Sequence, residues 1–330
     1  MKQLFIIIFL LFSMGIGAQA TFYPDIEIKP DLHHKPVYVI PEPVAPKPTP
    51  VIKPTPVVKP TPFIPKNYNG KVSVDAMYET IRALSTNPRV ACTIEEQTAG
   101  EYLEGKLIAL GYDTQWQQVS AQFRNPDKTL GAPCLSSNIF AVLNYNPNKK
   151  TILLVAHRDS VYVTGANDNA SGSAMVVELA AYFASYPLKN YNVAVLITGS
   201  EEGQHAGAKA YVAAPFIPLS LTKLVLNFDM VGAGSAYELF AYTNKNLGSA
   251  YMSYALKVGR AFNLNIVKKQ TKYSDHKEFE EKGVSAVTFM NLASYPYYHK
   301  PTDTINRISK TTLRNISNIA LNLIEEVDRN

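Results

Sequence analysis

The chain has 330 residues, a formal net charge of +5, and a composition in which 46% of the residues are hydrophobic and 18% are charged. So small a charge over this length argues against a nucleic-acid partner, and the hydrophobic content is that of a folded protein. The two ends of the chain nevertheless differ sharply in composition.

The first 20 residues have the features of a secretory signal peptide. Lys2 supplies a small positive region, Leu4–Phe12 an apolar core, and Ala18-Gln19-Ala20 a cleavage site of small residues. The apolar core is much shorter than the roughly 20 residues needed to cross a bilayer, so we expect no stable membrane anchor after cleavage. We expect an exported protein, periplasmic or secreted, that begins at Thr21.

Residues 21–66 contain 13 of the 22 prolines of the chain, with a near-repeat of Lys-Pro-Thr-Pro at 45–66. Prolines at this density favour extended polyproline II and cannot build a core. The segment is therefore predicted to be a Pro/Lys-rich linker that acts as a semi-rigid spacer. A propeptide or a partner-binding stalk is the alternative.

Residues 67–330 read as one folded domain in which apolar, β-branched runs alternate with helical patterns. Strands are expected at 138–143, 151–156, 192–197, 223–228, 237–241 and 286–290. Helices are expected at 75–85, 96–110, 170–185, 206–213, 249–262 and 311–328. This alternation predicts an α/β fold, a three-layer α/β/α sandwich with a mixed, mostly parallel central sheet.

Chemically versatile side chains follow three of the predicted strands. His157 and Asp159 follow the first, Glu201 and Glu202 the second, and Asp229 the third. Ligands of open α/β sheets bind outside the carboxyl ends of the strands, and neighbouring parallel strands place those ends side by side. The five side chains are therefore expected to lie close together.

Asp168, just before a predicted helix, and His299, in a loop after the last strand, complete the set. Each residue alone has an ordinary explanation; Asp168 could contribute to a helix cap, and Asp229 could form a turn. Together, however, His157, Asp168, Glu202, Asp229 and His299 are two imidazoles and three carboxylates, a set that suits zinc.

The motifs of the domain resemble those of the M28 family of zinc aminopeptidases over most of residues 75–330. The matching stretches are "AHRDSV", "GANDNASG", "GSEEGQHAG", "NFDMVG", "SDHKEFEEKGVSA" and "YYHKPTDT". They occur in the order of the family and with comparable spacing, so the resemblance is specific.

The resemblance implies a role for each of these residues. Asp168 would bridge two zinc ions, with Glu202 and His299 completing one site and His157 and Asp229 the other. Glu201 would be the general base that acts on metal-activated water. The resemblance also implies that Asp159 orients His157, and it places Asp275 and His276 among the residues that support the ligands.

Some positions depart from the family pattern. Where many members have Glu-Glu-x-Gly-Leu-x-Gly-Ser, this chain has Gln204, His205 and Ala208. Lys272 and Tyr273 stand before the Ser-Asp-His segment, where some bacterial members have a cysteine pair. Residues expected to flank an apolar substrate pocket are Met230, Phe289, Tyr295 and Tyr297.

The only cysteines, Cys92 and Cys134, both lie in the domain. In an exported protein, they are expected to form one disulfide, and two buried free thiols are the alternative.

The expected activity is that of a zinc-dependent aminopeptidase that acts on peptides with a free N-terminus. A glutaminyl-peptide cyclotransferase shares the expected fold, but cyclases usually carry a tryptophan before the last histidine, and the single tryptophan here is Trp116. A carboxypeptidase or dipeptidase usually needs a cation for the substrate carboxylate, and the sequence offers no convincing one. A non-catalytic exported binding module would not need Glu201.

Overall fold

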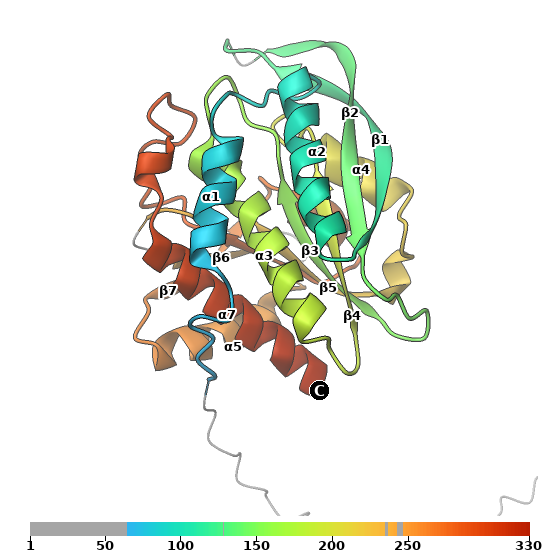
Figure 1. The fold of residues 1–330 in the computed structure, drawn as a ribbon, viewed down its shortest axis with the longest axis vertical. Helices are drawn as coiled ribbons and strands as arrows, with labels where there is room; N and C mark the ends of the chain where they lie inside the picture. Colours follow the sequence, from blue (N-terminus) through green and yellow to red (C-terminus); the bar gives the residue numbers. More distant parts are fainter. Residues whose placement is uncertain (1–64, 128, 235–236, 243–246) are drawn as a thin grey trace, which may run out of the picture. The chain divides into compact units, whose positions relative to one another are not determined.

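Eight strands form a single sheet in the computed structural model, which describes residues 65–330 except 128, 235–236 and 243–246 (Figure 1). The strands are β1 (Asp113–Arg124), β2 (Leu130–Val142), β3 (Thr151–His157), β4 (Asn192–Thr198), β5 (Thr222–Phe228), β6 (Tyr237–Tyr242), β7 (Ile266–Thr271) and β8 (Ala286–Met290). Their order across the sheet is β1-β2-β4-β3-β5-β8-β6-β7.

The middle of the sheet is parallel. The four central strands β4, β3, β5 and β8 run parallel to one another. On one side, β2 runs antiparallel to β4 and β1 antiparallel to β2; on the other, β6 runs antiparallel to β8 and β7 parallel to β6. The predicted mixed, mostly parallel α/β architecture is confirmed. β1 and β7 were not predicted; they are the two edge strands, and their sequences are polar.

Helices cover both faces of the sheet. They are α1 (Val74–Leu84), α2 (Ile94–Ala109), α3 (Ser171–Ser185), α4 (Ala206–Ala213), α5 (Ser249–Ala261), α6 (His276–Glu281) and α7 (Lys310–Arg329), with the short turns η1 (Ala166–Ala170), η2 (Leu219–Leu221) and η3 (Ile305–Arg307). Three of the longer helices begin at a side-chain cap, Ser73, Thr93 or Ser309, which accepts a backbone N–H of the first turn. α6 was not predicted.

Two hydrophobic cores lie on opposite faces of the sheet. Ile152, Leu154 and Ala156 of β3 join the larger core under α1, α2, α3, α5 and α7, whereas Leu153 and Val155 join the smaller core under α4 and α6. This alternation follows from the two-residue period of a strand. Because both faces are covered, the central strands are buried throughout, and their polar residues gather at the ends.

Within the described residues, Lys66, next to the predicted start of the domain, is bound to the last helix. Its backbone N–H donates to Asn322 Oδ1 of α7, and its carbonyl accepts from Asn322 Nδ2. The predicted signal segment 1–20, and the linker up to residue 64, lie outside the described residues. Among the described helices, none is long and apolar enough to span a membrane.

A disulfide joins the segment before α2 to the edge hairpin. It links Cys92 to Cys134 of β2, with 6.1 Å between their Cα atoms and 42 positions between them in sequence. In the chain-entropy model, a bond closing a loop of this length stabilises the fold by on the order of 3–4 kcal/mol.

Candidate metal centre

The parallel strands deliver the predicted residues to one edge of the sheet. His157 is the last residue of β3, Glu201 and Glu202 follow β4, and Asp229 follows β5. β3 pairs in parallel with both β4 and β5, so the three strand ends are adjacent. The register of the sheet therefore brings the ends of these three strands, which carry the predicted residues, next to one another.

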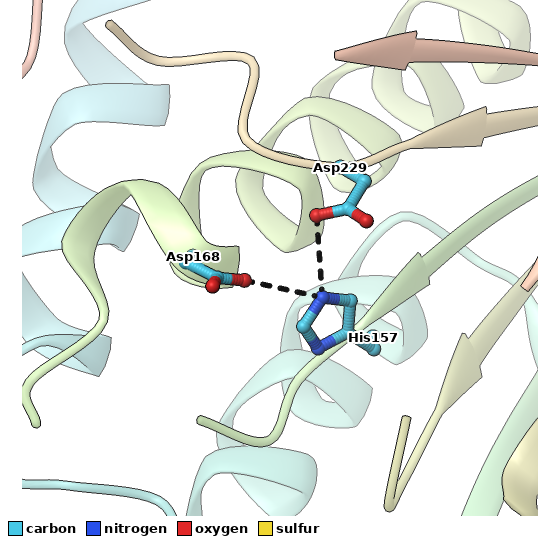
Figure 2. Close-up of side chains that lie close together, drawn as sticks. All are labelled: His157, Asp168 and Asp229. Carbon is cyan, nitrogen blue, oxygen red and sulfur yellow. Dashed lines mark hydrogen bonds and ion pairs between the residues drawn. The ribbon is translucent and has the colours of Figure 1, made fainter. Parts of the chain in front are cut away.

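His157, Asp168 and Asp229 form a fully buried group, here called the inner cluster (Figure 2). His157 Nε2 lies 3.3 Å from Asp229 Oδ1 and 3.4 Å from Asp168 Oδ1. Figure 2 shows the three side chains converging from a strand end, a loop after a strand and the start of a helix.

Asp168, Glu202 and His299 form a second group, here called the outer cluster. His299 Nε2 lies 3.0 Å from Glu202 Oε1 and 3.2 Å from Asp168 Oδ2. The His299 side chain is 30% exposed, whereas that of Asp168 is 5% exposed. Asp168 therefore belongs to both clusters, one oxygen facing each.

Asp168 is held in place by a short segment between β3 and α3. It lies in the π-helical turn η1, and its peptide bond to Asn169 is cis. The Asn169 side chain donates to the Phe228 carbonyl of β5 and accepts from the Met230 N–H. A side chain at Gly172 would collide with the same carbonyl, so close packing of backbone on backbone keeps Asp168 near Asp229.

Burial and mutual repulsion control the charges of the glutamates. Burial, with the charge of Asp168, raises the pKa of Glu202 to about 7. Burial also raises the pKa of Glu201 well above its usual range, and the carboxylates of Asp229 and Glu202 add to this. Such a concentration of buried carboxylates is stabilised by a cation.

The pKa values of the two histidines are raised as well, in their case by the neighbouring carboxylates. Burial alone lowers the pKa of His299, but the nearby carboxylates of Asp168 and Glu202 raise it to about 10. Burial also opposes protonation of His157, yet the charge of Glu201 and the neighbouring carboxylates raise its pKa well above the ordinary value. The surrounding carboxylates therefore favour the protonated form of both imidazoles.

The donor set fits zinc on its own chemistry. Imidazole nitrogens and carboxylate oxygens are the ligands that zinc takes in catalytic sites, and the ligand atoms of each cluster lie within 4.8 Å of one another. Asp168 Oδ2 is buried and accepts no hydrogen bond of normal geometry from the described residues. A buried carboxylate that has such an oxygen and is shared between two clusters suits a bridging ligand.

Asp159 connects the ends of β3 and β4. Its carboxylate accepts the backbone N–H groups of Glu201 and Glu202, at 3.0 and 3.1 Å, and Oδ1 lies 3.5 Å from His157 Nδ1. One buried carboxylate thus fixes the turn with the two glutamates and faces Nδ1 of His157, the ring nitrogen that points away from Asp168 and Asp229.

The Ser-Asp-His segment contacts the site through its serine. Ser274 Oγ donates to Asp229 Oδ2 at 2.8 Å. Asp275 accepts from Thr198 Oγ1, and burial raises the pKa of Asp275 to about 6. His276 is buried at the start of α6, with Nε2 3.3 Å from the Thr271 carbonyl.

The residues expected at an apolar pocket fall into different environments. Met230 and Tyr295 are buried in a small cluster against which Tyr297 packs, whereas Phe289 lies in the main core and stacks on Phe228. Tyr295 also donates its hydroxyl to Asp303.

Two residues at the site were not singled out from the sequence. Asp303 accepts the backbone N–H groups of Asn167 and Asp168, at 2.8 and 3.1 Å, and so holds the residue that both clusters share. Tyr298 stacks on His299 with 3.8 Å between ring centroids; burial and the charge of Asp168 raise its pKa. Both lie in the matched stretch "YYHKPTDT", which pointed to this segment but not to the contacts that these two residues make.

The sequence profile of peptidase family M28 matches residues 138–324, a range that contains every residue of both clusters. The chain belongs to peptidase family M28. It is 29% identical over 188 residues to aminopeptidase YwaD of Bacillus subtilis, a match covering 53% of this chain and 40% of the relative. A vacuolar membrane protease of Pyricularia oryzae is 28% identical over 175 residues, 50% of this chain and 17% of that protein. This M28 chain thus matches less than half the length of these curated relatives.

Solved structures share the fold at low identity. An aminopeptidase from Aneurinibacillus sp. strain AM-1 superposes with a TM-score of 0.68 and 19% identity, covering 78% of this chain and 94% of that one. A glutaminyl cyclase from Porphyromonas gingivalis gives a TM-score of 0.66 and 21% identity, covering 78% and 99%. Because proteins named for two activities share this fold, the fold alone does not select between them.

Proposed function

We propose that this M28 chain is a zinc-dependent aminopeptidase that removes N-terminal residues from peptides. The observation that carries the proposal is the pair of clusters sharing Asp168, with Glu201 next to the outer ligand Glu202. The inner and outer clusters would each hold one zinc ion. Bound zinc would polarise the scissile carbonyl and lower the pKa of the attacking water.

Glu201 is the general base of the proposed reaction. It takes the proton of the attacking water and later delivers it to the leaving amine. Its backbone is fixed by Asp159, and its side chain lies 3.5 Å from His205 Nε2. A rigidly held base is in position before the substrate arrives.

A free α-ammonium is the substrate feature that the site favours. The carboxylates of Asp168, Glu202 and Asp229 gather there beside Glu201 and can accept hydrogen bonds from an ammonium, whereas an N-acetylated nitrogen has no positive charge to offer them. The glutaminyl cyclase alternative needs one zinc ion only, so the complete inner cluster favours the peptidase.

Hydrolysis of a panel of aminoacyl-nitroanilides by the purified chain tests this function. We expect a chelator to abolish hydrolysis, zinc to restore it, and metal analysis to find close to two ions per chain. N-acetylated substrates are the matched control and should not be cleaved. Full activity of the metal-free protein, or equal cleavage of acetylated substrates, would contradict the proposal.

We also propose export of the protein through residues 1–20, with 21–66 as the linker before the domain. The support is the sequence pattern of those segments. N-terminal sequencing of the protein recovered outside the cytoplasm should begin at Thr21.

A further inference from the structure

His205 occupies a position where many M28 members have leucine, and it is turned toward the metal centre. It lies in the turn between Glu202 and α4, with a left-handed backbone at φ 58°. Its backbone N–H donates to the Glu201 carbonyl at 2.7 Å, and its side chain is 15% exposed. A polar ring in so enclosed a place requires partners on both nitrogens.

Both partners are present, and they define the tautomer. The backbone N–H of Ser274 donates to His205 Nε2 at 3.1 Å, so Nε2 accepts. Nδ1 lies 3.2 Å from Glu278 Oε1, and a carboxylate accepts, so Nδ1 carries the hydrogen. Burial opposes ionisation of Glu278, but hydrogen bonds from His205 and Lys277 lower its pKa below the ordinary value.

The contact continues into the inner cluster. Ser274, whose backbone N–H is bound by His205, donates its hydroxyl to Asp229 Oδ2. That bond occupies one carboxylate oxygen and leaves Oδ1 facing His157 Nε2 at 3.3 Å. Asn227 Nδ2 donates to Ser274 Oγ at 2.7 Å, which directs the serine hydroxyl hydrogen toward Asp229.

We propose that His205 is a positioning residue for the inner metal site, acting through Ser274 on the ligand Asp229. Hydrogen bonds link Glu278 to His205, His205 to Ser274, and Ser274 to Asp229. Leucine cannot accept the Ser274 N–H, so this link is particular to the histidine. The inference rests on the proposed metal-dependent function, because it concerns the affinity of one of the two ions.

A second role is geometrically available and predicts a different result. His205 Nε2 lies 3.5 Å from Glu201 Oε1, so the ring also borders the proposed base. If His205 acted through the base alone, its replacement would lower turnover and leave both zinc affinities unchanged. Metal affinity therefore separates the two roles.

The test is competition of the purified full chain with a chromophoric zinc chelator, resolved into two affinities. His205→Asn keeps a donor toward Glu278 but withdraws the acceptor from Ser274. Because partners of metal ligands contribute about 10- to 100-fold to affinity, we expect one zinc affinity to fall about tenfold and the other to remain. His205→Gln places an amide oxygen where Nε2 lies, so it can accept the Ser274 N–H and should keep that zinc affinity near the wild-type value. Gln204→Leu, at the exposed neighbouring position, is the matched control and should leave both affinities unchanged.

A double-mutant cycle assigns the route. In a Ser274→Ala background, the hydroxyl bond to Asp229 is absent, so His205→Asn should add no further loss. Glu278→Ala removes the carboxylate that binds His205 Nδ1 and should cause a smaller loss of zinc affinity at the same site. This variant replaces His205→Asn in the test if His205→Asn does not fold. Unchanged affinities, equal losses at both sites, or full additivity with Ser274→Ala would overturn the inference. A wild-type chain that binds no zinc would instead refute the proposed function.

Discussion

The inner and outer clusters share Asp168 but are built differently. The other inner residues, His157 and Asp229, follow adjacent buried strands and are 1% and 7% exposed in their side chains. In the outer cluster, His299 comes from a loop beyond β8 and is 30% exposed. Ligands at strand ends are placed by the sheet register, whereas a loop ligand depends on the contacts that hold its loop.

The supporting contacts differ in the same way. In the inner cluster, Asp159 faces His157 and Ser274 binds Asp229, all within a dry environment. In the outer cluster, His299 is stacked by Tyr298, which is itself 43% exposed. We therefore expect the inner cluster to be a rigid part of the fold and the outer cluster to be the adaptable side of the site.

Removing the shared ligand should have the largest effect. Asp168→Asn replaces an anionic bridge by a neutral amide, so both zinc affinities should fall and turnover should drop by at least about 1,000-fold, since the metals supply several kcal/mol. Zinc content and nitroanilide hydrolysis measure this. Asp113→Asn, the same change at an exposed position of β1, should be neutral. Normal turnover of Asp168→Asn with two bound ions would show that Asp168 is not the ligand that the inner and outer sites share.

Variants of the two adjacent glutamates should separate proton transfer from zinc binding. Glu201→Gln removes the base but no ligand, so zinc content should persist while kcat falls by roughly 10²- to 10⁴-fold. Glu202→Gln changes an outer ligand and should weaken zinc binding as well as activity. Parallel metal analysis and kinetics of both variants decide this. The opposite pattern, with zinc lost from Glu201→Gln and retained by Glu202→Gln, would reverse the two roles.

The two histidines should differ in their effect on metal-free stability. His157→Ala leaves two buried carboxylates without their partner and should lower the free energy of unfolding by roughly 1–3 kcal/mol. His299→Ala, at the more exposed position, should cost about 1 kcal/mol or less. Urea unfolding with chelator present measures both. Equal losses would show that burial does not distinguish the clusters.

Tyr295→Phe should have a small effect. It removes one of three hydrogen bonds to the carboxylate of Asp303, the residue that holds the backbone of Asp168, and should lower the free energy of unfolding by about 0.5–1.5 kcal/mol. Because Asp168 is shared, any loss of zinc affinity should be similar at both sites. Chelator competition provides the measurement; a loss confined to one site would show that Asp303 serves one cluster only.

The sequence was sufficient for the parts of the molecule that have a regular pattern. The buried central strands have apolar runs, and candidate metal ligands lie at their ends, so His157, Glu202 and Asp229 could be expected to converge. β1 and β7 escaped prediction because edge strands with polar sequences lack that pattern.

Contacts between distant segments could not be predicted in this way. Asp303 binds Asp168 across 135 positions, and His205 meets Ser274 across 69, so neither contact leaves a local signature. The direction of a single side chain was also hard to predict. Phe289 lies in strand β8, and its sequence position did not show which face of the sheet its ring would join. It was expected near the substrate, and it packs in the main core against Phe228.

The position of β8 has a consequence for how the protein is made. β8 is the last strand in the chain, yet it lies inside the sheet between β5 and β6. During synthesis, β6 and β7 therefore emerge before the strand that joins them to the rest of the sheet, and the edge of β5 stays open until residues 286–290 arrive. His299 follows only after that strand. A nascent chain can thus bring the inner residues together early, but the outer cluster is completed only near the end of translation, and a chain that stops before β8 lacks the strand that joins β6 and β7 to β5.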